Sequence, residues 1–381
     1  MNTLILTCST GQGHNSCASA IKEYFDLQGQ PCVIEDALGF VSPALSRIIC
    51  WGHVTIYRHF HSLVQAGYRY SETHCGLFRP SSLVYHLLTC GTGAIRSYLL
   101  EHRIDTVICT HVFASLMLTQ LQRTAPLPLV TCLVATDYTC TPGTRESVVD
   151  RYFIPDAPLL RHFEAPAIAR AQIVSSGIPI RQMFTACGKP GAAKQALRLD
   201  PKGLHLLMMC GSMGCGPMKQ LSRKIAEQLP ENTDFSIICG TNRALERRLR
   251  RLFAHQPRIH VYGYVTDIST MMDSADLYLT KPGGISVTEA AAKGLPMVFI
   301  DAVAGCEEYN KRYFISRGAA ATADSVDGLA RICTTLLRQP RQLEQMRRSL
   351  STLEKRNAAA IIFSELKTMN GAISSHEKTC C

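Results

Sequence analysis

Short apolar runs alternate with amphipathic segments along the chain, and this pattern predicts alternating strands and helices. The first apolar run lies close to the N-terminus and is followed by a glycine turn. The segment 16–27 then places Ala18, Ile21 and Phe25 on one face of a helix, and a second strand is expected at 32–36. A strand, a glycine turn, a helix and a strand in this order are typical of a parallel α/β domain.

The same alternation continues through the first half of the chain and restarts in the second half. Strands are expected at 105–111, 129–137, 149–154 and 172–180, and after the restart at 204–209, 235–239, 259–262, 276–280 and 297–300. We therefore predict an α/β protein with two Rossmann-like, doubly wound parallel-sheet domains that face each other across a cleft. The expected parts are a first domain at 1–184, a Gly/Pro/Lys-rich linker at 185–202, a second domain at 203–340, a closing helix at 341–368 and a tail at 369–381.

The stretch 38–90 departs from this pattern because it is long and rich in aromatic residues. Two helical segments, at 44–51 and 54–70, carry apolar and aromatic side chains among basic ones, including Trp51 and Arg58. Aromatic and basic residues together on amphipathic helices suit a membrane interface. Helices that simply pack on the domain are the alternative, and the pattern leaves both open.

Composition narrows the class of protein and its location. The chain has 381 residues, no apolar run reaches the ~18 residues that span a bilayer, and the N-terminus lacks the features of a secretory signal. Its 17 cysteines form no Cys-x-x-Cys pair, which favours reduced thiols in the cytoplasm. The net charge of +10 suggests an anionic partner, namely a nucleotide, a nucleic acid or an anionic membrane, with a solvated basic face without function as the alternative.

The first glycine turn carries a histidine at a helix start. Gly11 and Gly13 precede His14 without the third glycine of a dinucleotide fingerprint or the Gly-Lys-Ser/Thr of a P-loop. The helix dipole disfavours the charged imidazolium, so His14 is a candidate base, with a local hydrogen-bonding role as the alternative. His111 and Asp137 follow two strands at the functional edge of a parallel sheet. Asp137 could orient His14, act as the base itself, or cap the following turn.

A second glycine turn, within 279–310, has the form expected of an anion site. Gly283 and Gly284 join a buried strand to a helix, where free N–H groups and the helix dipole favour a phosphate. Glu289 lies one turn into the helix, placed to accept hydrogen bonds from a sugar diol, while an ordinary βα turn is the alternative. A further glycine loop follows the strand at 204–209, and a polar loop with Glu307, Glu308 and Asn310 is expected after the strand at 297–300.

These motifs together resemble a known family. They are Thr10-Gly-Gln-Gly-His14, Gly211-Ser-Met-Gly214, Gly263-Tyr-Val265, Lys281-Pro-Gly-Gly-Ile-Ser-Val-Thr-Glu289 and Gly305-Cys-Glu-Glu-Tyr-Asn310. In this order and spacing they look like the monogalactosyldiacylglycerol synthase and diacylglycerol glucosyltransferase family, which is related to the N-acetylglucosaminyltransferase of peptidoglycan lipid synthesis. The resemblance covers about residues 3–365, and it is strongest at 205–320 and weakest at 40–100.

The resemblance implies a GT-B glycosyltransferase that is inverting and needs neither a metal nor a cofactor, with a UDP-sugar held by the second domain and a lipid acceptor by the first. Cys306 stands where the family often has Gln, which leaves the identity of the sugar open. The implied donor residues are Gly211, Ser212, Met213, Gly214, Gly283, Gly284 and Ser286 at the diphosphate, Tyr264 and Val265 at the uracil, Glu289 at the ribose, and Glu307, Glu308 and Asn310 at the sugar. His14 matches the base, and Gly11 and Gly13 form its loop.

The expected function is the transfer of glucose or galactose from a UDP-sugar to diacylglycerol, by a protein held peripherally on the inner face of a bacterial cell membrane. The chain has no Asp-x-Asp metal motif, which agrees with a metal-independent route. Alternatives are another lipid acceptor such as an undecaprenyl-linked sugar, an epimerisation without acceptor, or a non-catalytic nucleotide-sugar sensor. Nucleic-acid binding by the arginine-rich segment 243–251 is disfavoured, because its arginines alternate with leucines and no aromatic residue offers a stacking surface.

Overall fold

A computed structural model gives the fold of the chain, and it describes all residues except 10, 43–60, 301–304, 354–356 and 380–381. The chain divides into two compact units, each described here by itself. Unit 1 comprises Met1–Gln182, Ala304–Cys306 and Arg356–Cys381, and unit 2 comprises Met183–Val303 and Glu307–Lys355. The expected linker at 185–202 therefore lies within unit 2, and the C-terminal helix belongs to unit 1.

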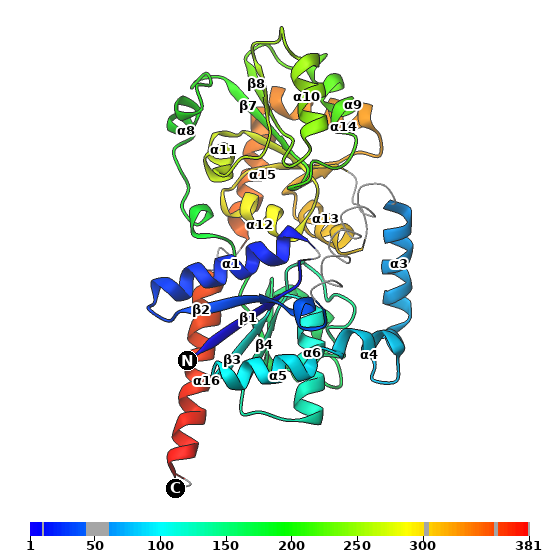
Figure 1. Cartoon of the computed structure of the whole chain (residues 1–381). Coiled ribbons are helices and arrows are strands. Elements are labelled where there is room, and N and C mark those ends of the chain that lie inside the picture. Colours follow the sequence, from blue (N-terminus) through cyan, green and yellow to red (C-terminus); the bar gives the residue numbers. More distant parts are fainter. Residues whose placement is uncertain (10, 43–60, 301–304, 354–356, 380–381) are drawn as a thin grey trace. The chain divides into compact units, whose positions relative to one another are not determined.

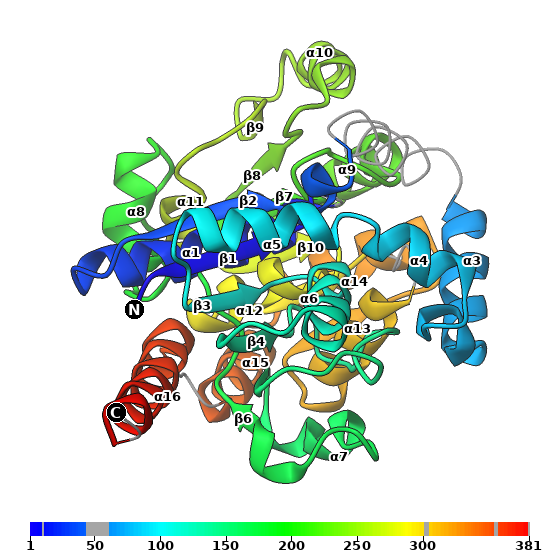
Figure 2. The same cartoon turned by 60° about the horizontal axis from the view of Figure 1, so that its bottom comes forward.

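Unit 1 contains a six-stranded, fully parallel sheet in the order β2-β1-β3-β4-β5-β6. Figure 2 shows β1, β3 and β4 side by side. The chain passes from β1 to β2 on one side and then places β3 on the other side of β1, so the topological switch point lies between β1 and β3. The strands are β1 (Thr3–Thr7), β2 (Cys32–Asp36), β3 (Thr106–Cys109), β4 (Val130–Val134), β5 (Arg151–Ile154) and β6 (Ile173–Ser175).

Helices cover this sheet and confirm the amphipathic pattern near the N-terminus. Helix α1 (Gln12–Leu27) buries Ala18, Ile21 and Phe25. The Phe25 ring lies 5.0 Å, centroid to centroid, from Phe363 of α16 (Ala358–Thr379), which crosses α1 at a steep angle (Figure 1). Among the described residues of unit 1, the other helices of four or more residues are η1 (Ala37–Phe40), α3 (His61–Thr73), η2 (Cys75–Phe78), α4 (Leu83–Thr89), α5 (Thr92–Glu101), α6 (Val112–Thr124) and α7 (Leu160–Phe163). Three-residue 3-10 turns are η3 (Ala157–Leu159), η4 (Arg170–Gln172) and, at the boundary between the units, η5 (Gln182–Phe184).

Unit 2 contains a second six-stranded parallel sheet in the order β12-β11-β10-β7-β8-β9. This is the strand order of the dinucleotide-binding fold, with the switch point between β7 and β10. Two six-stranded parallel sheets confirm the predicted fold class. The elements are β7 (Leu204–Met209), β8 (Thr233–Ile238), β9 (Ile259–Tyr262), β10 (Leu277–Thr280), β11 (Met297–Phe299), β12 (Ala320–Thr322), α8 (Pro190–Ala196), α9 (Met218–Ala226), α10 (Arg243–Leu252), α11 (Ile268–Ser274), α12 (Gly284–Ala292), α13 (Cys306–Ser316), α14 (Val326–Arg338) and α15 (Pro340–Thr352).

Several predicted elements differ from the structure. The polar loop expected after β11 is instead helix α13, whose first turn holds Glu307 and Glu308, where acidic side chains interact favourably with the helix dipole. The single closing helix expected at 341–368 is divided between α15 and α16. Pro340 occupies the start of α15, where its missing N–H costs nothing, and the expected tail is helical to Thr379. The helix predicted at 44–51 and the part of 54–70 before α3 lie outside the described residues.

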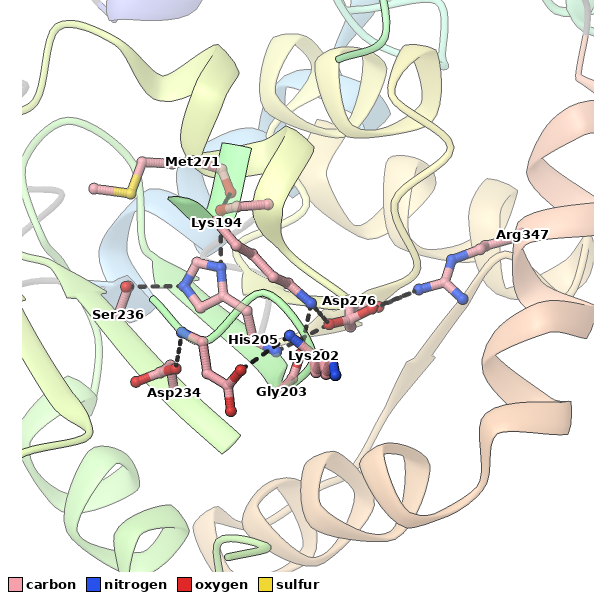
Figure 3. A network of polar contacts seen from close by, with 11 residues as sticks. Lys194, Lys202, Gly203, His205, Asp234, Ser236, Met271, Asp276 and Arg347 are labelled. Carbon is pink, nitrogen blue, oxygen red and sulfur yellow. Dashed lines mark hydrogen bonds and ion pairs between the residues drawn. The ribbon is translucent and has the colours of Figure 1, made fainter. Parts of the chain in front are cut away.

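A buried polar network fastens three elements of unit 2 together (Figure 3). Lys194 of α8 donates to the Gly203 carbonyl at 2.7 Å and pairs with Asp276 Oδ2 at 2.8 Å. Asp276, directly before β10, also accepts the backbone N–H of His205 at 2.9 Å and pairs through Oδ1 with Arg347 of α15 at 3.1 Å. One carboxylate thus joins the segment before the sheet, strand β7 and the last helix of the unit.

His205 lies at the centre of this network and is fully buried. The Ser274 hydroxyl donates to the Met271 carbonyl at 2.8 Å, so its oxygen accepts from His205 Nδ1–H at 2.9 Å. His205 Nε2 then accepts from the Ser236 hydroxyl at 2.8 Å. Burial lowers the pKa of His205 to about 4, so the ring is neutral at neutral pH and Nε2 is free to accept.

The buried neutral state of His205 predicts a loss of stability in mild acid. The folded pKa of about 4 lies below the ordinary 6.5, so the unfolded chain binds the extra proton as the pH falls between these values. We expect this group to lower the free energy of unfolding by about 2 kcal/mol between about pH 7 and about pH 5. Urea denaturation of wild type and His205→Asn at both pH values measures the effect. An equal pH dependence in the two proteins would contradict it.

Candidate functional site

The β1–α1 turn of unit 1 places His14 beside the end of β3. His14 Nδ1 lies 2.8 Å from the Thr110 carbonyl oxygen and 3.2 Å from Thr136 Oγ1. Because a carbonyl only accepts, the Nδ1 of His14 carries the hydrogen. The neutral ring therefore keeps an unprotonated Nε2, the atom that can accept a proton.

The surroundings of His14 keep its imidazole neutral. Burial is the largest effect and lowers the pKa of His14, whereas the negative charge of Asp137 and the hydrogen bond to Thr110 raise it without reversing the shift. The Thr136 hydroxyl lies 3.4 Å from Asp137 Oδ2 and can donate to it. Asp137 is thus connected to His14 through Thr136, a contact that suits an orienting role, one of the three possibilities that the sequence leaves open.

Other residues around this turn have local structural roles. The His111 ring lies 4.5 Å from the His14 ring, centroid to centroid, and its Nδ1 accepts the Phe113 N–H at 3.1 Å to cap α6. Gly11 precedes α1 in an extended conformation with open space where a Cβ would lie, and Gly13 is in the first turn of α1. Thr10 lies outside the described residues.

In unit 2, the loop after β7 interlocks with the loop after β8. Gly214 has a φ of +56°, and a Cβ there would lie 2.4 Å from the Cys239 carbonyl oxygen. Gly240 has a φ of +57°, and a Cβ there would lie 2.1 Å from the Ser212 carbonyl oxygen. Only glycine suits both positions. The close approach fixes the path of 211–214, and with it Ser212 and Met213, at the carboxyl end of β7.

The adjacent strand β10 ends in the second predicted turn. Thr280 Oγ1 donates to the Met209 carbonyl at 2.7 Å and ties β10 to β7. Gly283 precedes α12 and Gly284 is its first residue, so the α12 N-terminus opens at the switch point of the sheet. Ser286 lies in the first turn of α12 with a half-buried side chain, and Glu289 is buried one turn further along.

Helix α13 is fastened to this turn by two side chains. Asn310 is fully buried, and its Nδ2 donates to the Pro282 carbonyl at 2.9 Å. Glu307 Oε1 pairs with Lys281 Nζ at 3.2 Å, with each side chain only 12% exposed. Glu308 instead pairs along the helix surface, with Lys311 at 2.6 Å and Arg312 at 3.1 Å.

The residues predicted at the uracil lie further along the same edge of the sheet. Tyr264 and Val265 follow β9, two strands from β7 in the sheet order. Tyr264 is 68% exposed and Val265 is half-buried. The switch point thus brings together 211–214, 283–289 and the start of α13, while Tyr264 and Val265 lie toward the edge.

Several residues of these turns escaped the sequence reasoning. Thr110 and Thr136 follow β3 and β4 and contact His14, and no local sequence pattern predicts these long-range contacts. Gly240 lies against Ser212 of another loop, a contact between distant segments. In the sequence, Tyr278 resembles any other residue of a buried strand. Lys281 is the first residue of the motif Lys281–Glu289. Its positive charge directly after an apolar strand could have indicated a role at this turn.

Two family models match most of the chain. Residues 14–180 match the model described as monogalactosyldiacylglycerol (MGDG) synthase. Residues 205–362 match the glycosyltransferase family 28 C-terminal domain. The first match begins at His14, after β1, and the second begins in β7 and includes both strands at the switch point of unit 2.

Curated relatives and solved structures agree with these matches. The chain is 27% identical over 359 residues to a processive diacylglycerol beta-glucosyltransferase of Staphylococcus carnosus, covering 92% of this chain and 88% of the relative. It is 25% identical to the protein of that name from Bacillus subtilis, over 99% of both chains. A structure of MurG from Acinetobacter baumannii is similar over 97% of this chain and 99% of that one, with a TM-score of 0.66 and 14% identity. MnaA of S. aureus, solved with UDP, is similar over 97% of both chains, with a TM-score of 0.64 and 12% identity.

None of the described helices is both long and apolar enough to cross a membrane.

The Lys281–Glu307 pair provides a test of how α13 is held. Removing one partner of a largely buried pair leaves an uncompensated charge, so we expect Lys281→Met and Glu307→Gln each to lower the free energy of unfolding by about 2 kcal/mol. The double variant is expected to lose less than the sum of the two. Chemical denaturation measures all three variants.

The pair of Glu308 and Arg312 on the same helix, in which the Arg312 side chain is 70% exposed, is the matched control. Breaking it with Arg312→Met should change the free energy of unfolding by about 1 kcal/mol or less. Additive effects of Lys281→Met and Glu307→Gln would show that the two side chains do not stabilise each other.

Proposed function

Because the chain belongs to the family of monogalactosyldiacylglycerol synthases and diacylglycerol glucosyltransferases, we propose that it transfers a hexose from a UDP-sugar to diacylglycerol. The observation that carries the proposal is the pair of glycine turns at the switch points of the two sheets. The turn in unit 1 positions the neutral imidazole of His14, and the turn in unit 2 presents the N-terminus of α12, which favours an anion. The names of the relatives support diacylglycerol as the acceptor.

The donor is proposed to bind unit 2 at the switch point between β7 and β10. Backbone N–H groups at the start of α12, with the Ser286 hydroxyl and the loop 211–214, donate hydrogen bonds to the diphosphate oxygens and stabilise their negative charge. Glu289 accepts hydrogen bonds from the ribose hydroxyls. Glu307 and Asn310 lie beside the turn 283–286, where the sugar attached to the diphosphate is proposed to bind. The UDP-bound similar structure supports this class of donor. Charge stabilisation by fixed dipoles is why we propose a reaction that needs no metal.

The chemical step is proposed to be a single displacement. His14 Nε2 accepts the proton of the diacylglycerol hydroxyl as its oxygen attacks the anomeric carbon of the sugar. The bond from that carbon to the UDP oxygen breaks, UDP leaves with the electron pair, and the configuration inverts. The Thr110 carbonyl keeps the hydrogen on Nδ1, and Asp137, through Thr136, favours the imidazolium that forms.

The proposal is tested by supplying one donor at a time. Purified full-length protein receives radiolabelled UDP-glucose or UDP-galactose with diacylglycerol in anionic mixed micelles, and the lipid product is identified by mass spectrometry. We expect a hexosyl-diacylglycerol from one of the two donors, formed equally well with a metal chelator present. A folded sample that binds UDP but forms no glycolipid from either donor would refute the acceptor assignment.

His14→Ala is the catalytic control in the same assay. Loss of a general base costs about 10²–10⁴-fold in rate, and because His14 belongs to unit 1 the affinity for UDP should stay nearly unchanged. Equal loss of turnover and of UDP affinity would instead favour a nucleotide-sugar sensor without catalysis.

Attachment to the inner face of the membrane is proposed to involve α4 of unit 1. Leu83 and Leu87 are four residues apart on one face of α4 and are 74% and 61% exposed. Exposed apolar side chains of this size are normally buried at an interface when they cluster. The exposed Arg79 precedes them, a combination that suits a bilayer with anionic headgroups.

Charge introduced on this face should weaken membrane binding. We expect Leu83→Asp/Leu87→Asp to reduce sedimentation with phosphatidylglycerol vesicles about tenfold, since a buried carboxylate must be desolvated. Leu100→Asp on α5, also an exposed leucine of unit 1 at 51%, is the matched control and should bind vesicles like wild type. If both variants bind vesicles as well as wild type does, the membrane contact lies elsewhere on the chain.

A further inference from the structure

Strand β10 contains a tyrosine whose hydroxyl is buried. Tyr278 is fully buried, between Leu277 and Leu279 in sequence. Its hydroxyl lies 2.9 Å from Ser286 Oγ in the first turn of α12. Phenylalanine would fill the same space without a hydroxyl that needs a partner. The phenol oxygen of Tyr278 is thus engaged by one of the residues assigned to the diphosphate.

The rest of α12 shows why such a contact matters for Ser286. A serine or threonine hydroxyl in a helix commonly donates to the carbonyl four residues back. Thr288, two residues along α12, does this with the Gly284 carbonyl at 2.6 Å. The equivalent carbonyl for Ser286 is that of Pro282, which already accepts from Asn310 Nδ2 at 2.9 Å. Ser286 is instead in contact with Tyr278.

The direction of the hydrogen bonds follows from the chemistry of a phosphate. Phosphate oxygens at neutral pH act as acceptors, so a hydroxyl that binds them must donate. If Ser286 donates to a phosphate, its oxygen is left to accept, and the Tyr278 hydroxyl, 2.9 Å away, is placed to donate to it. Burial, the largest effect, raises the pKa of the Tyr278 hydroxyl, which therefore keeps its hydrogen at neutral pH.

We propose that Tyr278 is a positioning residue that donates to Ser286 and so directs the Ser286 hydroxyl at the diphosphate of the donor. This inference rests on the proposed function, because it assumes that a nucleoside diphosphate binds at the start of α12. The relay runs from the Tyr278 O–H to Ser286 Oγ and from the Ser286 O–H to a phosphate oxygen. Donation from Tyr278 polarises the Ser286 hydroxyl and strengthens its bond to the anion.

Calorimetric titration with UDP and with uridine separates this role from a structural one. Removing the Tyr278 hydroxyl in Tyr278→Phe should weaken UDP binding about fivefold, whereas uridine, which lacks the diphosphate, should bind as it does to wild type. Ser286→Ala should weaken UDP binding by at least as much. The double variant should bind UDP like Ser286→Ala alone, because the relay has already lost its last member.

A second buried tyrosine gives the matched control. Tyr152 of unit 1 is 1% exposed and donates to the Ser147 carbonyl at 2.5 Å. Tyr152→Phe also loses a buried phenol, and it should lower thermal stability without changing UDP affinity. Thermal melting of every variant confirms that each is folded before titration.

Two results would overturn the relay. In the first, Tyr278→Phe binds UDP as tightly as wild type while Ser286→Ala binds it weakly. In the second, Tyr278→Phe loses affinity for UDP and for uridine by the same factor relative to wild type. A wild-type chain that binds neither UDP nor uridine would overturn the proposed function itself, and the relay with it.

Discussion

The alignment of parallel strands is the constraint on which both candidate sites depend. In a parallel sheet every strand ends at the same edge, and at a switch point two neighbouring strands send their connections to opposite faces. Unit 1 has this point between β1 and β3, and unit 2 has it between β7 and β10. The two turns that carry chemistry, at His14 and at 283–286, are the turns that follow β1 and β10.

Each site depends on contacts that fix a proton or a backbone path. In unit 1, the Thr110 carbonyl decides which nitrogen of His14 carries hydrogen, and so which one can act as a base. In unit 2, Gly214 and Gly240 allow two loops to meet closer than any side chain permits. The network around Asp276 lies at the opposite end of β10, before its first residue, and holds the strands that carry these loops.

Much of the fold was predictable because hydrophobic periodicity is a local signal. The segment 259–262 was predicted with the bounds of β9, and the burial of Ala18, Ile21 and Phe25 was foreseen. The polar start of α13 was wrongly predicted to be a loop. Glu307 and Glu308 are stabilised there by the dipole of the helix that follows them, an effect that a run of polar residues does not reveal by itself. Thr136 and Tyr278 were missed because their partners are distant or unremarkable in sequence. The roles assigned to the site residues by motif stay predictions until a ligand is bound.

Hydrogen–deuterium exchange with and without UDP shows whether unit 2 binds a nucleoside diphosphate at its switch point. We expect UDP to slow exchange of the backbone amides at 211–216 and 283–290, because they bind or cover the diphosphate, and to leave 11–17 unchanged. Slower exchange at 11–17 alone, or no change at either loop of unit 2 under saturating UDP, would contradict it.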